Sequence, residues 1–203
     1  MHLPLPADLL SPGFYSNPDV VDVSRKLLGK VLCSTIGGTF TSGIIIETEA
    51  YSGRNDKACH AYNGLRTKKT EVMYGDPGHA YIYLCYGMHH LFNVVTNVNG
   101  LADAVLIRAI YPLEGKQEIV NRRNIKSEKN LTDGPGKLTQ ALGITVDLTG
   151  CSLFEPPVWI EDRNLRVNPK RIEETPRIGV DYAGKDAQKL WRFTINPTHF
   201  VSK

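Results

Sequence analysis

The chain has 203 residues, of which 41% are hydrophobic and 22% are charged. These proportions are those of an ordinary globular protein, and the length fits one domain spanning residues 1–203. The formal net charge is +3 and the isoelectric point is near 8.6. Such a small charge excludes nucleic-acid binding through bulk charge alone, so that role would need a local basic patch.

The start of the chain, residues 1–6, has no basic segment followed by an apolar one, so we expect no secretory signal there. No apolar run approaches the roughly 18 residues of a membrane-spanning helix. Four cysteines are dispersed without a CxxC pair, at Cys33, Cys59, Cys85 and Cys151. That spacing disfavours a zinc ribbon and is typical of reduced thiols, so we expect a cytoplasmic protein.

Residues 1–16 are rich in proline and are expected to be irregular. A helix is expected to follow, with Asn17 as its N-cap, Pro18 in its first turn and Gly29 at its end. Residues 30–36 and 39–46 are expected to pair as a hairpin. Gly37-Gly38 between them supplies the positive φ angles that a tight turn needs.

The second arm of that hairpin continues into a strand, residues 44–51, which is rich in β-branched side chains. Side chains alternate along a strand, so Glu47, Glu49 and Tyr51 are expected to share one face with Ile45. Ile44, Ile46, Thr48 and Ala50 are expected to face the core. His60 follows across a polar loop and can fold back over the carboxylates. This face is therefore our candidate active site.

Residues 52–77 form a long, polar segment whose basic residues include Arg66, Lys68 and Lys69. A polar composition of this kind is most often that of a solvated surface loop. A loop this long in a compact domain nevertheless more often has a function than none. Residues 80–84 and 92–96 are expected to pair as a hairpin with Tyr86 near its tip. Tyr81 and Tyr83 would share one face of the first strand.

Residues 104–110 are expected to form a third central strand, in which Arg108 needs a partner, a ligand or an open face. A helix is expected over 114–124, followed by a basic stretch, 122–129, which is more often solvated than bound to phosphate. Gly134-Pro135-Gly136-Lys137 opens another helix, which ends at Gly143 and whose free amides could seat a phosphate.

Short strands are expected at 158–160, 177–180 and 191–195. Strands outnumber helices and do not alternate with them regularly. The sequence therefore predicts an α+β fold: mostly antiparallel sheet, flanking helices and a protruding tyrosine-rich hairpin.

Several motifs in this order resemble the alkyladenine (3-methyladenine) DNA glycosylase family. They are Glu47-Thr48-Glu49-Ala50-Tyr51, Cys59-His60-Ala61, Tyr81-Ile82-Tyr83-Leu84-Cys85-Tyr86-Gly87-Met88 with Asn93, Leu106-Ile107-Arg108-Ala109, Gly134-Pro135-Gly136-Lys137-Leu138 and Arg177-Ile178-Gly179-Val180. The resemblance extends from about residue 18 to residue 193. A compact start without the long tail of eukaryotic relatives resembles the bacterial form.

The resemblance implies a role for each matched residue. Glu49 would be the general base that activates a water, and Tyr51, His60 and Tyr83 would line the pocket around an extruded base. Asn93 would exclude guanine from that pocket, and Tyr86 would enter the minor groove. Contacts with the DNA backbone are implied for Arg108, Gly136 and Lys137.

The resemblance also implies double-stranded DNA with damaged purines as the partner, no cofactor or metal, and action as a monomer. It leaves open which damaged base is preferred. The chain departs from the family where relatives commonly read Arg-Thr-Pro-Arg-Asn, because it has Arg66-Thr67-Lys68-Lys69-Thr70. The loop 97–103 is also slightly longer than in some relatives. These departures concern contacts of the loops with DNA rather than the pocket.

The proposed chemistry agrees with these residue types. Cleavage of an N-glycosidic bond passes through an oxocarbenium-like state, which a carboxylate stabilises while it accepts a proton from water. No lysine stands next to Glu49 in the sequence, which favours direct hydrolysis over Schiff-base chemistry. A pair of nearby carboxylates is costly when both are buried, so Glu47 is expected to be structural and paired with Arg108 or a loop cation.

Two other classes of protein remain open from the sequence. One is a metal-dependent hydrolase that uses His60, His89, His90 and a glutamate. It is disfavoured because adjacent histidines on a strand point to opposite faces. The other is a non-catalytic nucleic-acid-binding module with the tyrosines as a stacking platform, which would not need Glu49.

Overall fold

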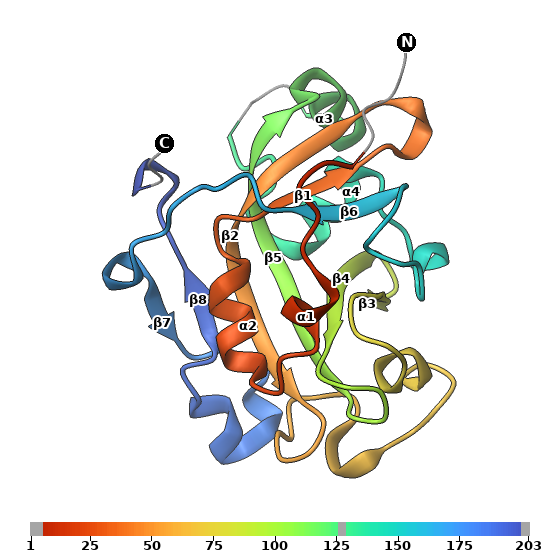
Figure 1. The fold of residues 1–203 in the computed structure, drawn as a ribbon, viewed down its shortest axis with the longest axis vertical. Coiled ribbons are helices and arrows are strands. Elements are labelled where there is room, and N and C mark those ends of the chain that lie inside the picture. The colour runs from red at the N-terminus through yellow and green to blue at the C-terminus, as the bar shows by residue number, and fades with distance from the viewer. Residues whose placement is uncertain (1–5, 126–128, 200–203) are drawn as a thin grey trace.

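The computed structural model describes residues 6–125 and 129–199 (Figure 1). Within these residues, eight strands form one antiparallel sheet, six of them in the order β3-β4-β5-β2-β1-β6. The strands are β1 (Val31–Ser34), β2 (Thr41–Ser52), β3 (Ala80–Cys85), β4 (His89–Thr96), β5 (Asp103–Glu114), β6 (Val158–Glu161), β7 (Glu173–Thr175) and β8 (Arg192–Thr194). The α-helices are α1 (Pro12–Tyr15), α2 (Val20–Leu27), α3 (Lys116–Arg123) and α4 (Pro135–Leu142). This architecture confirms the predicted α+β class and its antiparallel sheet.

Strand β2 is central because it pairs along one edge with β5 and along the other with β1 and then β8. The β2–β5 register shifts on both sides of Glu47, which indicates a bulge there. Ile45 is fully buried in the same core cluster as Ala50. The prediction that Ile45 shares the face of Glu49 was therefore wrong, since the bulge reverses the alternation between them.

From β2 to β3 the sheet has two distinct faces. One face carries Ala50, Ile82, Val94 and Val105 in the main core. Helix α2 lies across this face (Figure 1), and its Val23 side chain is buried there. The apolar positions of α2 recur at helical spacing, so the helix is held by packing along one side.

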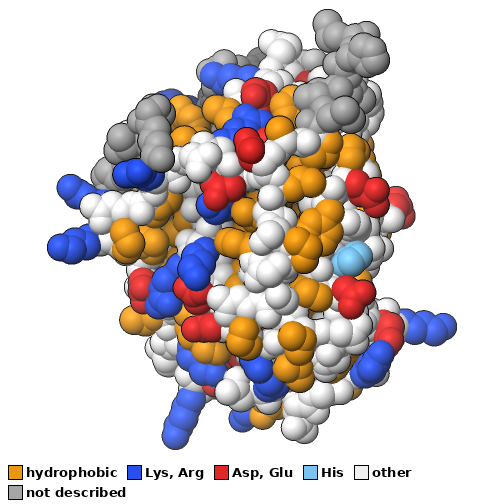
Figure 2. All heavy atoms as spheres, in the orientation of Figure 1, with side chains coloured by type: hydrophobic (Ala, Val, Ile, Leu, Met, Phe, Trp, Pro, Cys, Tyr) orange, Lys and Arg blue, Asp and Glu red, His pale blue; other side chains and the backbone are white. Residues whose placement is uncertain are grey.

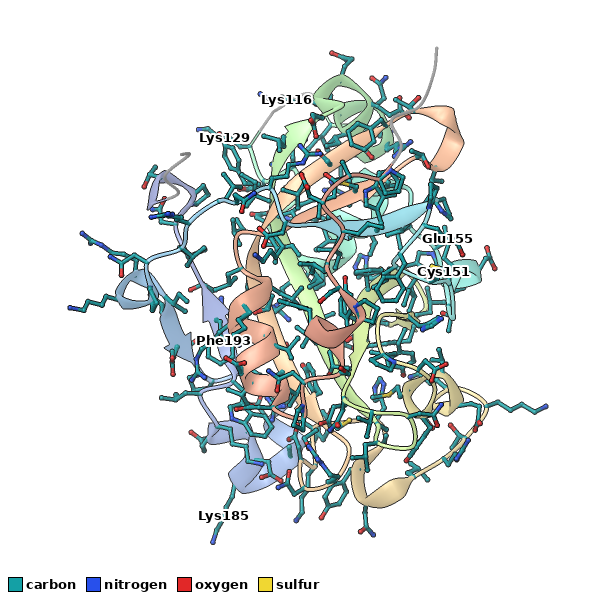
Figure 3. The ribbon with its side chains drawn as sticks, in the orientation of Figure 1. Lys116, Lys129, Cys151, Glu155, Lys185 and Phe193 are labelled. Carbon is teal, nitrogen blue, oxygen red and sulfur yellow. The ribbon has the colours of Figure 1, made fainter. Side chains whose placement is uncertain are left out.

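Helix α4 adds Leu138 and Leu142 to the same core. In β8, Phe193 is fully buried beside α2 (Figure 3), and the Arg25 guanidinium lies 4.6 Å from its ring centroid. Helices α2 and α4 therefore both pack against the main core of the sheet.

The opposite face of these strands is covered at one end by the long segment between β2 and β3. Cys59, Ala61 and Met73 of this segment are buried against Tyr81 of β3 and Ala104 of β5. The segment contains short 3₁₀ turns at Tyr62–Gly64 and Glu71–Tyr74. It is thus packed onto the sheet rather than solvated along its length, and it forms one wall of the pocket described below.

The N-terminal segment is more ordered than the sequence predicted. Helix α1 lies within the residues expected to be irregular, and Leu9 forms an isolated bridge with Glu161. The N-cap of α2 is Asp19, whose carboxylate accepts the amides of Val21 and Asp22. Asn17 instead accepts the amide of Asp19 through its side chain. The prediction of Asn17 as N-cap was wrong by two residues.

Both predicted hairpins are present. Gly37 and Gly38 have positive φ angles, but the connection between β1 and β2 runs over residues 35–40 and is not a two-residue turn. The β3–β4 hairpin pairs Tyr83 with Leu91 and carries Tyr86 at its tip. The side chain of Tyr86 is 89% exposed.

Three predictions in the second half of the chain need correction. Helix α3 begins at Lys116, because Glu114 is still in β5. In the basic stretch, Arg122 is a structural residue: its guanidinium donates to Glu118 and to the backbone oxygens of Ile36 and Ala141. Residues 126–128 of that stretch lie outside the described residues.

The third correction is that residues 177–180 form no strand. Helix α4 matches the prediction, since Gly143 ends it with a φ of 74°.

The surface mixes both signs of charge. Figure 2 shows basic and acidic side chains interspersed over one face of the molecule. Within the described residues, no helix is long and apolar enough to cross a membrane.

Candidate active site

A pocket of about 440 Å³ opens on the sheet face opposite α2. The register of four strands places Glu49 opposite Leu106, Leu106 opposite Asn93, and Asn93 opposite Tyr81. These four residues form one row across β2, β5, β4 and β3. The aromatic side chains around the pocket are Tyr51, His60, Tyr81, Tyr83, Tyr86, His89 and Tyr182. The pocket is therefore flat-walled and largely apolar.

Glu49 is fully buried, just beneath residues that line this pocket. Its Oε2 accepts the Tyr51 hydroxyl at 2.7 Å and Arg108 Nη1 at 3.3 Å. Its Oε1 accepts the backbone amide of Ile178 at 2.8 Å. A carboxylate has about four acceptor positions, so three donors fix its orientation and leave room for one more.

The second glutamate of the strand is held by two arginines. Glu47 Oε1 accepts Arg108 Nε at 2.9 Å and Arg192 Nε at 2.6 Å. Burial lowers the pKa of Arg108, but Glu49 and Glu47 outweigh burial and raise the pKa above its ordinary value. The predicted pairing of Glu47 with Arg108 is confirmed. Arg108 lines the pocket between the two carboxylates.

His60 and two tyrosines form one aromatic wall. His60 Nδ1 and the Tyr81 hydroxyl are 2.7 Å apart, and the His60 and Tyr83 ring centroids are 4.6 Å apart at an interplanar angle of 73°. Burial, with a smaller effect from Lys69, lowers the pKa of His60 to about 4. The imidazole is therefore neutral near pH 7. Burial and then the Glu49 charge raise the pKa of Tyr51, which keeps its hydroxyl protonated.

Asn93 lines the pocket and is buried. Its Nδ2 donates to the backbone oxygens of Tyr81 at 3.0 Å and Leu91 at 3.2 Å. These two bonds hold the amide in one orientation against the strand pair. The Asn93 side chain therefore bonds the backbone of the hairpin and also faces the pocket.

The hairpin tip and the start of α4 border the pocket. Tyr86 has a φ of 50° and is followed by Gly87 at 70°, so two successive left-handed residues turn the chain. At the start of α4, Gly134 has no side-chain cap, which leaves helix amides unpaired by side chains. A Cβ at Gly136 would lie 2.9 Å from the His89 ring, so another residue here would require the histidine to shift. Lys137 Nζ is exposed and 2.7 Å from Asp133.

The two neighbouring histidines of β4 point to opposite sides. His89 lines the pocket, whereas His90 accepts the backbone amide of Val146 through Nδ1. They cannot converge on one ion. Across residues 6–125 and 129–199, no three His, Cys, Asp or Glu side chains are grouped closely enough to hold a metal.

Sequence reasoning missed three parts of this site. The sequence predicted that Tyr81 and Tyr83 share a face of the strand, but no sequence feature indicated that Tyr81 contacts His60. The Ile178 amide is a backbone group in a segment predicted to be a strand. Arg177 and Asp56, which form a buried ion pair, were not singled out as a pair at all.

A buried, oriented carboxylate beneath an aromatic pocket is an arrangement that can hold a flat ring next to a proton acceptor. Residues 13–199 match the family model described as methylpurine-DNA glycosylase. A protein of Bacillus thuringiensis strain Al Hakam is 47% identical over 201 residues, which covers 95% of this chain and 98% of that protein. Proteins of Bacillus cereus strain AH820 and Bacillus anthracis strain CDC 684 are each 46% identical with the same coverage.

All three relatives are named "putative 3-methyladenine DNA glycosylase". The chain belongs to the methylpurine-DNA glycosylase family. The resemblance inferred from the sequence motifs is thereby confirmed. The family is one of DNA glycosylases, which are hydrolases.

Proposed function

We propose that this protein extrudes a damaged purine from duplex DNA and hydrolyses its N-glycosidic bond with a water activated by Glu49, leaving an abasic site. The observation that carries the proposal is the position of Glu49. It is a buried carboxylate held by Tyr51, Arg108 and the Ile178 amide directly under an aromatic pocket.

The chemistry follows from that geometry. Water attacks the anomeric carbon of the sugar while the bond to the purine breaks, and the bonding electrons leave with the base. Glu49 accepts the proton of the water and offsets the positive charge that develops on the sugar. A purine that is already cationic leaves as a neutral base, so one carboxylate is sufficient.

Glu49 has no exposed surface while Tyr51 and Arg108 cover it. We propose that the water reaches its remaining acceptor position through a small shift of these covering side chains. Contacts of catalytic groups commonly tighten or rearrange only when the substrate is bound. The Ile178 amide would keep the carboxylate oriented while these side chains move.

The pocket walls support recognition of a purine ring. Tyr51, His60 and Tyr83 offer aromatic faces, which attract a cationic alkylpurine by about 1–2 kcal/mol for a desolvated pair. Because the pKa of His60 is about 4, the imidazole carries no charge that would repel such a base. Alkylated adenine and guanine are therefore the proposed substrates, with hypoxanthine as a neutral candidate.

The pocket rim supports contact with DNA. We propose that Tyr86 fills the space that the extruded base leaves in the duplex, since its exposed ring stands at the hairpin tip. The amides at Gly136, the ammonium of Lys137 and the guanidinium of Arg108 are proposed to meet backbone phosphates. We further propose action as a monomer in the cytoplasm, with no cofactor.

The test is release of free base from a panel of duplexes, each with one lesion: 3-methyladenine, 7-methylguanine, hypoxanthine or a cyclised adenine. The expected product is an intact strand with an abasic site, cleaved only after alkali. Borohydride trapping of the protein on DNA would instead indicate lyase chemistry. Tight binding without base release from any duplex would support the non-catalytic binding module.

A further inference from the structure

Arg177 and Asp56 form an ion pair whose two side chains are both fully buried. Arg177 Nη1 is 2.5 Å from Asp56 Oδ2, and Nη2 is 2.7 Å from Oδ1, so the pair is two-pronged. The same guanidinium donates to the backbone oxygens of Ala50 at 2.8 Å and Asp186 at 3.1 Å. Its centre lies 4.8 Å from the Tyr51 ring centroid.

These contacts join the segments that surround Glu49. Ala50 stands in β2 between Glu49 and Tyr51, and Asp56 belongs to the loop that leads to His60. Arg177 is the neighbour of Ile178, whose amide donates to Glu49 Oε1. One guanidinium therefore fixes the distance between the strand that carries the carboxylate and the segment that donates to it.

The segment that carries this amide is irregular between two anchored ends. Residues 177–180 form neither helix nor strand, and the Ile178 side chain is 51% exposed. Gly179 has a φ of 74° and no atom within 4 Å of a Cβ placed there. Val180 is buried against Ala58 and Ala183 after the amide, so Arg177 is the anchor that holds the segment before it.

A buried ion pair is a poor device for stability alone, because desolvation offsets most of the attraction. A two-pronged pair does fix relative orientation, since both hydrogen bonds are lost when either side chain rotates. That property fits a positioning role next to a group whose orientation matters.

We propose that Arg177, held by Asp56, positions Glu49 for catalysis by fixing the Ile178 amide against its carboxylate. Arg177 touches no reacting atom in this role and acts through Glu49. The proposal rests on the proposed function, in which Glu49 activates water.

The test uses Asp56→Asn and Arg177→Lys in the full chain, with Arg163→Gln as the matched control. Arg163 also pairs with two carboxylates, Glu114 and Glu161, but none of these three lines the pocket. Three quantities are measured for each variant: the single-turnover rate of base release, the Kd for lesion duplex, and the melting temperature.

The two site variants are expected to slow base release by about 10–100-fold, because displacement of a catalytic group by about 1 Å has effects of that size. Their Kd should stay within about 3-fold of wild type, since phosphate contacts dominate affinity. The control should keep its rate, and it should lose less thermal stability because its ion pairs are partly exposed. Equal rate losses in the control and site variants would overturn the proposal.

A double-mutant comparison separates positioning from a general loosening of the fold. When Asp56→Asn is added to Glu49→Gln, the further loss should shrink to within about 3-fold, because the group being positioned is already disabled. An undiminished 10–100-fold loss in that background would overturn the proposal. If wild type releases no base at all, the proposed function fails instead.

Gly179→Ala keeps the experiment decisive should both ion-pair variants fail to fold. It leaves the pair intact and meets open space, but strains the segment because alanine disfavours a positive φ. Base release should fall in the presence of Glu49 and not in the Glu49→Gln background. No loss, or the same loss in both backgrounds, contradicts the proposal.

Discussion

Tyr51 donates its hydroxyl to Glu49 Oε2 across 2.7 Å, from two residues further along the same strand. The two side chains share one face of β2, and the ring of Tyr51 lines the pocket while the carboxylate lies beneath it. One hydrogen bond thus links a residue of the pocket wall to the candidate general base, so a substitution of either residue is expected to change the position of the other.

Glu49→Gln is expected to slow base release by about 10²–10⁴-fold, the range for loss of a general base. Glutamine keeps the shape of the side chain but cannot accept the proton of the water. Binding to lesion duplex should be unchanged within a few-fold. Single-turnover release is the measurement, and Glu47→Gln is the control because it removes a carboxylate from the same face. Release by Glu49→Gln within a few-fold of wild type would show that Glu49 is not the base.

Tyr86→Ala is expected to weaken base extrusion more than DNA affinity. The exposed ring contacts little in the free protein, whereas phosphate contacts dominate affinity. A fluorescent base analogue at the lesion reports extrusion directly. Tyr111→Ala removes another exposed tyrosine that does not line this pocket and serves as control. Equal extrusion by wild type and Tyr86→Ala would show that Tyr86 does not fill the space left by the extruded base.

Asn93→Ser is expected to raise release of guanine and 7-methylguanine relative to hypoxanthine. The 2-amino group of guanine would meet the amide of Asn93, which its bonds to Tyr81 and Leu91 hold in place, and serine removes that obstacle. Duplexes with each of the three bases provide the comparison. A uniform loss across all three would mark Asn93 as a structural residue only.

Lys69→Gln is expected to favour a cationic base over a neutral one by about 2–5-fold, the effect of one exposed cation–π contact. Lys69 Nζ lies 4.7 Å from the centroid of the Tyr83 ring, so a cationic purine on that ring must approach a positive charge. The ratio of 7-methylguanine to hypoxanthine release measures the effect. Lys68→Gln makes the same charge change one residue earlier. An identical ratio in both variants would mean that only the overall charge matters.

His60 should make the fold sensitive to acid. Its pKa is about 4 when folded, below the ordinary 6.5, so the unfolded chain binds more protons between these values. Stability from His60 is complete above pH 6.5 and is lost as the pH falls toward 4. The ring is partly exposed, so we expect a loss of roughly 2 kcal/mol by pH 4.5.

Denaturant unfolding of wild type and His60→Gln at pH 7.5 and 4.5 measures this contribution. Glutamine does not titrate, so the variant should lose less of its free energy of unfolding on acidification. Equal losses in the two proteins would assign the acid sensitivity to groups other than His60.

The alternation of side chains along strands determined much of the site at the level of sequence. Glu47, Glu49 and Tyr51 share a face because strands have a period of two, and Tyr86 stands at a hairpin tip because the two strands around it pair in register. A local signal also ended α4, because Gly143 readily adopts the positive φ of a helix C-cap. These features depend on a few neighbouring residues, which is why a single sequence determines them.

Tertiary structure decided the contacts between distant segments. The bulge at Glu47 reversed the face of Ile45, because pairing with β5 rather than local propensity set the register there. Residues 177–180 were expected as a strand, but they are irregular, and the buried Arg177–Asp56 pair joins them to a residue 121 positions away in sequence. The Ile178 amide that donates to Glu49 lies in this segment. A backbone donor carries no mark in its side chain, so only the folded chain shows which carboxylate it meets.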